Sequence, residues 1–237
     1  MRKNRICTIA LSVAVFAVVL GTASLAKAAD DKAPYPAMAP FDQYLMQDQN
    51  AEIALARSAA PESIARDAAV MVLGHHGYEK AVQGKNGFVC VVERGWTAGI
   101  NDPNFWNPKL RGPICLNAAA ARSYLPRTIK KTELVIAGRS KSEMFVAIMA
   151  ALNKKELPDL EPGAMAYMLS KDSYLGDGNG HWHPHVMFFT NGKDIANWGA
   201  NSTGSPVLAQ ENDEERMTTF YIPVGQWSDG TNDEAGH

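Results

Sequence analysis

The sequence predicts a single α+β domain with a mainly antiparallel sheet and a few packed helices. Helix-forming segments dominate its first half, strand-like segments dominate its second half, and the links between strands have the composition of hairpin turns. A regular alternation of strands and helices would instead indicate a parallel sheet. The chain has 237 residues, which is enough for one domain with a substantial core.

The N-terminus has the three parts of a secretory signal peptide. Three basic residues within the first five precede an apolar run at 6–20, and a small-residue cleavage site follows at 26–28. The apolar run is shorter than the roughly 20 residues of a spanning helix, which argues against an uncleaved anchor. We therefore expect residues 1–28 to be removed, leaving a soluble periplasmic or extracellular protein.

Charge and cysteine content narrow the class of protein further. Cleavage removes four of the 23 basic residues, which leaves 19 against 25 acidic ones and a net charge of about −6. With no large basic patch, neither nucleic acid nor a membrane surface is an expected partner. Cys90 and Cys115 remain, and two cysteines in an oxidising compartment predict a disulfide. A free metal-binding or redox thiol pair is the alternative, but no Cys-x-x-Cys motif supports it.

The first half of the chain contains one clear strand and several helical segments. We expect in order an extended lead-in with three prolines, a helix, a short helical piece after Pro61, and a buried strand ended by Gly74: 29–40, 42–58, 62–66 and 69–73. The globular domain is expected to span 41–227, followed by a flexible tail at 228–237.

Two further strand-like segments, 78–82 and 88–93, flank Gly84-Lys85-Asn86-Gly87. Asn-Gly between apolar runs favours a hairpin, because both residues tolerate positive φ. Segment 88–93 is apolar on both faces, as in a central strand. The irregular stretch 94–114 is long enough to be either functional or disordered, and a disulfide would hold its two ends together.

The middle of the chain is helical and its end is β. Asn117 can cap a short helix that stops before Pro126, while residues 128–137 are ambiguous between helix and strand. Ser140 and Glu143 have capping-box spacing, which predicts a helix that ends before Pro158. The expected later strands are 164–169, 185–190, 207–209 and 218–224.

The candidate site is a cluster of three histidines before an apolar strand. His181, His183 and His185 share one face of an extended chain, because side chains repeat every two residues. Pro184 favours extended backbone at His183 and removes a ladder donor, so the segment is an edge, a bulge or a strand start. Neighbouring histidines would be about 6.6 Å apart and the outer two about 13 Å apart, so one ion reaches all three only if the chain bends.

A divalent transition metal, Zn or Cu, is the cofactor that this cluster favours. Further ligands would come from elsewhere in the chain: His75, His76, Glu93, Asp172 or Asp177. If the metal is hydrolytic, His181 and His183 would hold it, and Glu93 or Asp177 would accept a proton from bound water. The alternatives are a metal-free acid–base role and a structural role at the edge of the core.

Tryptophans support a second hypothesis, a non-catalytic envelope protein that binds a glycan-like ligand, another small molecule or a protein partner. All five lie in expected loops or at strand ends: Trp96, Trp106, Trp182, Trp198 and Trp227. Such rings can form flat binding surfaces, although they more commonly cover the ends of a core. No hydrolase, zincin or phosphate-loop motif is present, and only Ser170 or Ser173 near a histidine would remain as a nucleophile. Asn201 begins a glycosylation sequon.

Overall fold

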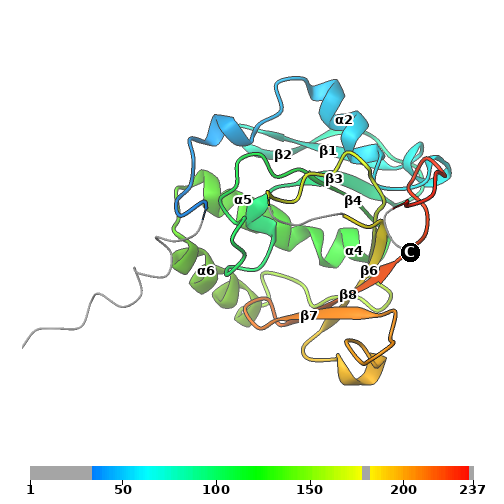
Figure 1. Cartoon of the computed structure of the whole chain (residues 1–237). Helices are drawn as coiled ribbons and strands as arrows, with labels where there is room; N and C mark the ends of the chain where they lie inside the picture. Colours follow the sequence, from blue (N-terminus) through cyan, green and yellow to red (C-terminus); the bar gives the residue numbers. More distant parts are fainter. Residues whose placement is uncertain (1–33, 178–181, 235–237) are drawn as a thin grey trace, which may run out of the picture. The chain divides into compact units, whose positions relative to one another are not determined.

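The computed structural model describes residues 34–177 and 182–234, which form one eight-stranded sheet and five α-helices (Figure 1). The strands are β1 (Ala69–Gly74), β2 (Gly77–Val82), β3 (Val89–Glu93), β4 (Gly112–Leu116), β5 (Met165–Met168), β6 (His185–Asn191), β7 (Leu208–Asn212) and β8 (Met217–Pro223). The helices are α2 (Gln49–Arg57), α3 (Glu62–Ala65), α4 (Ala118–Ser123), α5 (Leu125–Ile136) and α6 (Lys141–Asn153). Short 3₁₀ turns lie at η1 (Phe41–Tyr44), η2 (Gly95–Thr97) and η3 (Ala196–Trp198).

The strand order across the sheet is β2-β1-β3-β4-β5-β6-β8-β7. Only β1 and β3 pair in parallel, and every other neighbouring pair in this sheet is antiparallel. The α+β fold class with a mainly antiparallel sheet is therefore confirmed. The strands expected around 69–73, 88–93, 164–169, 185–190, 207–209 and 218–224 all form, with small differences at their ends.

Side-chain alternation divides the sheet into two packed faces. On one face, Val70, Cys90 and Val92 pack against alanines of α2 and α3. On the other face, Val91 and Ile114 lie in one cluster with residues of α4 and α5. In Figure 1, α2 accordingly lies above β1, β3 and β4, and α4 and α5 lie below them. Because side chains repeat every two residues, Glu93 shares the α5 face with Val91.

Cys90 and Cys115 form a disulfide between directly paired residues of β3 and β4, as expected. It joins the two strands on either side of the loop after β3; the stretch 94–114, expected to be irregular, ends earlier because residues 112–114 belong to β4. Both cysteines are fully buried on the α2 face, so the bond belongs to the core and not to a reactive surface.

The hairpin expected at Gly84–Gly87 is wrong. β2 folds back on β1 through the tight turn at His75-His76, and β3 then pairs with the other edge of β1. Segment 84–87 thus crosses the start of β1, and Lys85 N donates to Asp67 O at 2.7 Å. Gly84 lies so close to this backbone that an added Cβ would be 2.2 Å from Ala69 N. These residues therefore let the chain pass close to the start of β1, and they do not form a hairpin turn.

Helix α2 is shorter than the expected helix at 42–58. It begins at Gln49, where the Asp48 carboxylate caps Asn50 N at 2.8 Å, and η1 occupies the preceding stretch. Its Glu52 carboxylate is fully buried and accepts a 2.9 Å charged hydrogen bond from Arg94. This ion pair ties α2 to the end of β3.

The middle helices follow their capping signals. Asn117 caps α4, and the complete capping box of Ser140 and Glu143 begins α6. The ambiguous residues 128–137 lie almost wholly in α5, where the Trp96 indole donates to Thr132 at 3.0 Å. Within the described ranges, every helix is too short or too polar to cross a membrane.

Candidate functional site

A cavity of about 260 Å³ lies on the face of the sheet that α4 and α5 cover. Alternate residues along the strands form its wall, and residues 97–99 and 102, at and after the end of η2, lie at its side. The polar and aromatic lining residues are Glu93, Thr97, Asp102, Tyr124, Trp182, His185, Phe189, Gln210, Asn212, Glu215, Thr219 and Tyr221. Two residues from the predicted site set, Glu93 and His185, therefore border one space.

Glu93 is a buried carboxyl group held by three hydroxyl groups. Its Oε1 accepts from Thr128 at 3.0 Å and from Tyr124 at 3.3 Å, and its Oε2 accepts from Thr97 at 3.3 Å. Burial raises the pKa of Glu93, against the smaller lowering effects of these bonds and of the Lys131 ammonium. The physical consequence is a carboxyl group that keeps its proton to higher pH than a solvated glutamate.

His185 lines the cavity and carries an unprotonated ring nitrogen. Its Nδ1 lies 3.0 Å from the His183 carbonyl oxygen, and because a carbonyl only accepts, Nδ1 carries the proton. Its Nε2 is buried and has no hydrogen-bond partner among the described residues. Burial lowers the pKa of His185, which favours the neutral ring. His185 is only 5% exposed and lines the cavity, so its ring is largely withdrawn from bulk water.

Two aromatic rings flank His185. The ring centroids of Trp182 and Tyr221 lie 4.5 and 5.6 Å from that of His185, both edge to face. The Trp182 indole nitrogen is also buried without a partner among the described residues, so this wall holds one unused donor, Trp182 Nε1, beside one unused acceptor, His185 Nε2. Burial, followed by the negative charges of Glu93 and Asp102, raises the pKa of Tyr221 to about 12.

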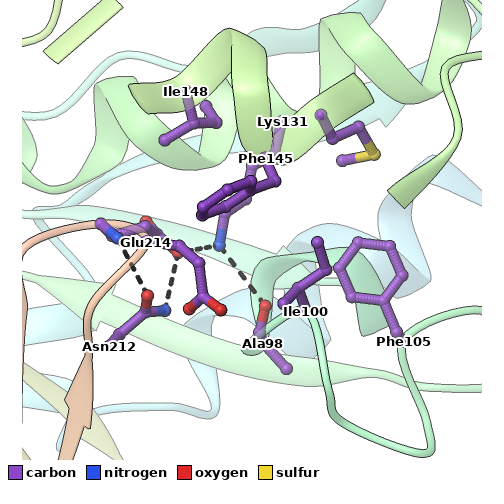
Figure 2. Close-up of a pocket in the computed structure, with 10 residues that line it drawn as sticks. Ala98, Ile100, Phe105, Lys131, Phe145, Ile148, Asn212 and Glu214 are labelled. Carbon is purple, nitrogen blue, oxygen red and sulfur yellow. Dashed lines mark hydrogen bonds and ion pairs between the residues drawn. The ribbon is translucent and has the colours of Figure 1, made fainter. Parts of the chain in front are cut away.

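An ion pair closes one side of the cavity. Lys131 of α5 pairs with the buried Glu215 carboxylate and donates to Thr97 O at 2.9 Å. Figure 2 shows the Lys131 side chain reaching the backbone of Ala98. Asn212 donates a hydrogen bond to the carboxylate of Glu215 beside it. The pocket in that view is apolar and only about 30 Å³, and it shares Ala98, Asn212 and Glu215 with the larger cavity. The ion pair is therefore part of the wall between two hollows.

The described histidines of the predicted cluster diverge. His183 Nδ1 lies 2.6 Å from an Asp233 carboxylate oxygen and its side chain is half-exposed, whereas His185 faces the cavity. His181 lies outside the described residues. Among the residues described, no three His, Cys, Asp or Glu side chains are grouped so as to hold a metal ion. Metal binding at this stretch stays a prediction.

The other proposed ligands lie away from the cavity wall. His75 and His76 are exposed in the β1–β2 turn, where His75 lies 3.5 Å from Asp42. Asp172 is exposed beside a buried serine, and Asp177 accepts hydrogen bonds from Tyr174 and Tyr35. Those two hydroxyl groups lower the pKa of Asp177. Through its bond with Tyr35, the carboxylate connects the N-terminal lead-in to the 174–177 segment.

Most of the tryptophans pack into the core. Trp96, Trp106 and Trp227 are buried, and Trp198 stacks on Phe220 with ring centroids 4.2 Å apart. Only Trp182 lines the cavity. Neither proposed serine nucleophile lines it: the Ser170 hydroxyl is 2.6 Å from that of Ser58, and Ser173 donates to the Ser170 carbonyl.

Sequence reasoning missed several residues of the site, among them polar residues of α5 and its N-cap, Tyr124. Tyr124, Thr128 and Lys131 follow i, i+4, i+7 spacing, so they share one helix face. That face turns toward Glu93 and the cavity wall. A polar stripe on a helix that also carries a buried apolar face was the available signal.

Comparison with known proteins gives no match: no family model, no curated protein and no solved structure is significantly similar to this chain. The function must be argued from the chain's own residues.

Proposed function

We propose that the protein binds a small organic molecule in the cavity and exchanges a proton with it through His185 and Glu93. The supporting observation is that His185 lines the cavity while its buried Nε2 has no partner among the described residues. A buried polar atom left unpaired is unfavourable by about 1–3 kcal/mol, so a ligand that bonds to it gains affinity. At about 260 Å³, the cavity is below the usual range for drug-sized ligands, which favours a smaller molecule.

The two ionisable groups suit opposite roles in proton transfer. Burial favours the neutral, basic form of His185 and the neutral, acidic form of Glu93. Such a pair, with pKa values displaced in opposite directions, supports a general base and a general acid in one site. The reaction that this pair would serve depends on the ligand.

A thermal-shift screen of small polar compounds tests this proposal. A ligand present at 100 times its Kd should stabilise the wild-type protein by roughly 2.7 kcal/mol. The His185→Phe variant should lose most of this effect, because it keeps an aromatic ring and lacks Nε2. His76→Phe is the matched control at an exposed histidine and should respond like the wild type. Equal stabilisation of both variants, or no stabilising compound at all, would contradict the proposal.

A transition metal bound at His185 is the second candidate. The bond from Nδ1–H to a backbone carbonyl is a common way to orient metal-binding histidines, and unprotonated Nε2 is the coordinating form. Zn and Cu both accept imidazole ligands. The test is the metal content of untagged protein, with His183→Ala and His185→Phe for comparison. A metal-free wild type that shows no thermal shift with either ion would exclude this candidate.

The non-catalytic alternative predicts a different result from the same screen. A glycan-like ligand on an exposed aromatic surface should perturb Trp198, the tryptophan that lies outside the core and is 38% exposed. Binding that survives His185→Phe and is lost in Trp198→Ala would favour this alternative over the cavity.

We also propose that the chain is exported. The leader-like pattern of residues 1–28 and the disulfide both support an oxidising compartment. Intact mass of the protein from its native host should show cleavage after Ala28, and a full-length cytoplasmic product would contradict it.

A further inference from the structure

The charged side chains described in the cavity lining are all acidic. Among the described residues that line it are three acidic side chains, Glu93, Asp102 and Glu215, and no lysine or arginine. Lys131, which lines the adjoining small pocket, already pairs with Glu215. Because opposite charges attract most strongly where water is scarce, this lining disfavours an anionic ligand and favours a cationic one.

Both remaining carboxyl groups act on the same part of the cavity. The negative charges of Glu93 and Asp102 each raise the pKa of the Tyr221 hydroxyl, which itself lines the space. A cation beside Tyr221 would therefore lie within the field of the Asp102 carboxylate. It would also favour ionisation of Glu93, which burial opposes in the ligand-free protein.

Aromatic rings provide a second reason for a cationic ligand. Trp182, Tyr124 and Tyr221 all line the cavity, and the face of such a ring attracts a cation within about 6 Å. Tyr124 already stacks on Phe189 at a centroid distance of 4.2 Å. Trp182 and Tyr221, which lie edge to face with His185, are therefore the rings that we expect to contact the cation.

The unpaired polar atoms specify hydrogen-bonding groups on the ligand. His185 Nε2 is more than nine-tenths buried with its residue and can only accept, so it calls for an N–H or O–H donor. Trp182 Nε1 can only donate, so it calls for an oxygen acceptor. The two rings are in contact, so one small molecule can satisfy both.

We propose that the ligand is a small primary amine, bound as its ammonium ion, that also carries a hydroxyl or carbonyl oxygen. This assignment rests on the proposed function and names the ligand class for the same cavity. The ammonium donates to His185 Nε2 within the field of Asp102, and the oxygen accepts from Trp182.

Matched compounds of different charge test the assignment. The probes are 4-amino-1-butanol, 1,4-butanediol and 4-hydroxybutyrate, within a panel of small amines and the alcohols and carboxylic acids of the same carbon skeletons. Titration calorimetry on the full mature chain gives the affinity of each compound. We expect the amines to bind on the order of tenfold more tightly than the matched alcohols, and the acids to bind most weakly.

An isosteric variant checks that the cavity's charge is the cause. Asp102→Asn keeps the oxygen that caps Asn104 N and removes one negative charge. It should weaken amine binding by roughly 3- to 10-fold and leave alcohol binding unchanged. Glu79→Gln, at an exposed position on β2, is the control and should change neither.

The outcomes separate this assignment from the function on which it rests. If the acids or alcohols bind as tightly as the amines in a His185-dependent way, the amine assignment is wrong and the cavity function stands. If no compound of any charge binds, both fall. Amine binding that is insensitive to Asp102→Asn would also overturn the electrostatic assignment.

Discussion

Replacing Glu93 with glutamine should stabilise the protein at neutral pH and have little effect in acid. Glutamine keeps an oxygen that accepts from Thr128 and Tyr124, and it resembles the protonated acid in shape. Burial raises the pKa of Glu93 above its ordinary value of 4.5, so between these two pKa values the folded state binds more protons than the unfolded state. Wild-type stability therefore falls relative to the variant as pH rises through this window.

The size of the effect follows from the displacement of the pKa. Each unit by which folding raises the pKa of Glu93 lowers stability above the folded pKa by about 1.4 kcal/mol. For a domain of this size, that corresponds to roughly 3–5 °C in Tm per unit. Thermal unfolding of the wild type and Glu93→Gln at pH 4 and pH 8 measures the difference directly.

The sign of this difference is the test of the buried acid. The variant should gain Tm over the wild type at pH 8 and match it at pH 4, where both side chains are neutral. A variant that is less stable at pH 8 would refute the reasoning, because it would mean that the Lys131 charge and the hydroxyl groups hold Glu93 as an anion. Glu79→Gln should show no such pH-dependent difference, since Glu79 is exposed.

Three further variants test the fold. Cys90→Ala with Cys115→Ala opens a loop of 25 residues, so denaturant unfolding should show a loss of about 3.5 kcal/mol, and no change would mean that the bond does not form. Ser140→Ala removes the capping box of α6 and should lower the unfolding free energy by about 1 kcal/mol, whereas a neutral result would place the helix start elsewhere. Arg94→Met leaves the Glu52 carboxylate buried without its cation, and a loss below about 1 kcal/mol would contradict the expected 3–5 kcal/mol.

Local signals in the sequence predicted most elements of the fold but not every strand pairing. The capping residues at 117 and 140 began helices as expected, because a cap acts within one turn of the chain. The Asn-Gly at 86–87 led to a wrong hairpin prediction, because a segment that turns and passes over a neighbouring strand needs the same residues as a hairpin. The packing of the segment against Ala69 decides between the two structures. Strand order depends on such distant contacts.

The candidate site was predicted in part for the same reason. His185 and Glu93 drew attention as a histidine at a strand start and an acid at a strand end, and they border one cavity. An extended chain would place His183 on the same face, but its ring contacts Asp233, a partner 50 residues away in sequence. Thr128 contacts Glu93 across 35 residues, and periodicity alone cannot reveal such a pair.

The protonation state of His185 is the most direct test of the central claim. Two-dimensional ¹H–¹⁵N NMR of the imidazole rings distinguishes a protonated from an unprotonated Nε2, and the best stabilising compound of the screen can be added to the same sample. We expect an unprotonated Nε2 at pH 7, with Nδ1 protonated, and a clear shift of the Nε2 signal on addition of the compound. A protonated Nε2 in the free protein, or a signal that no stabilising compound changes, would contradict it.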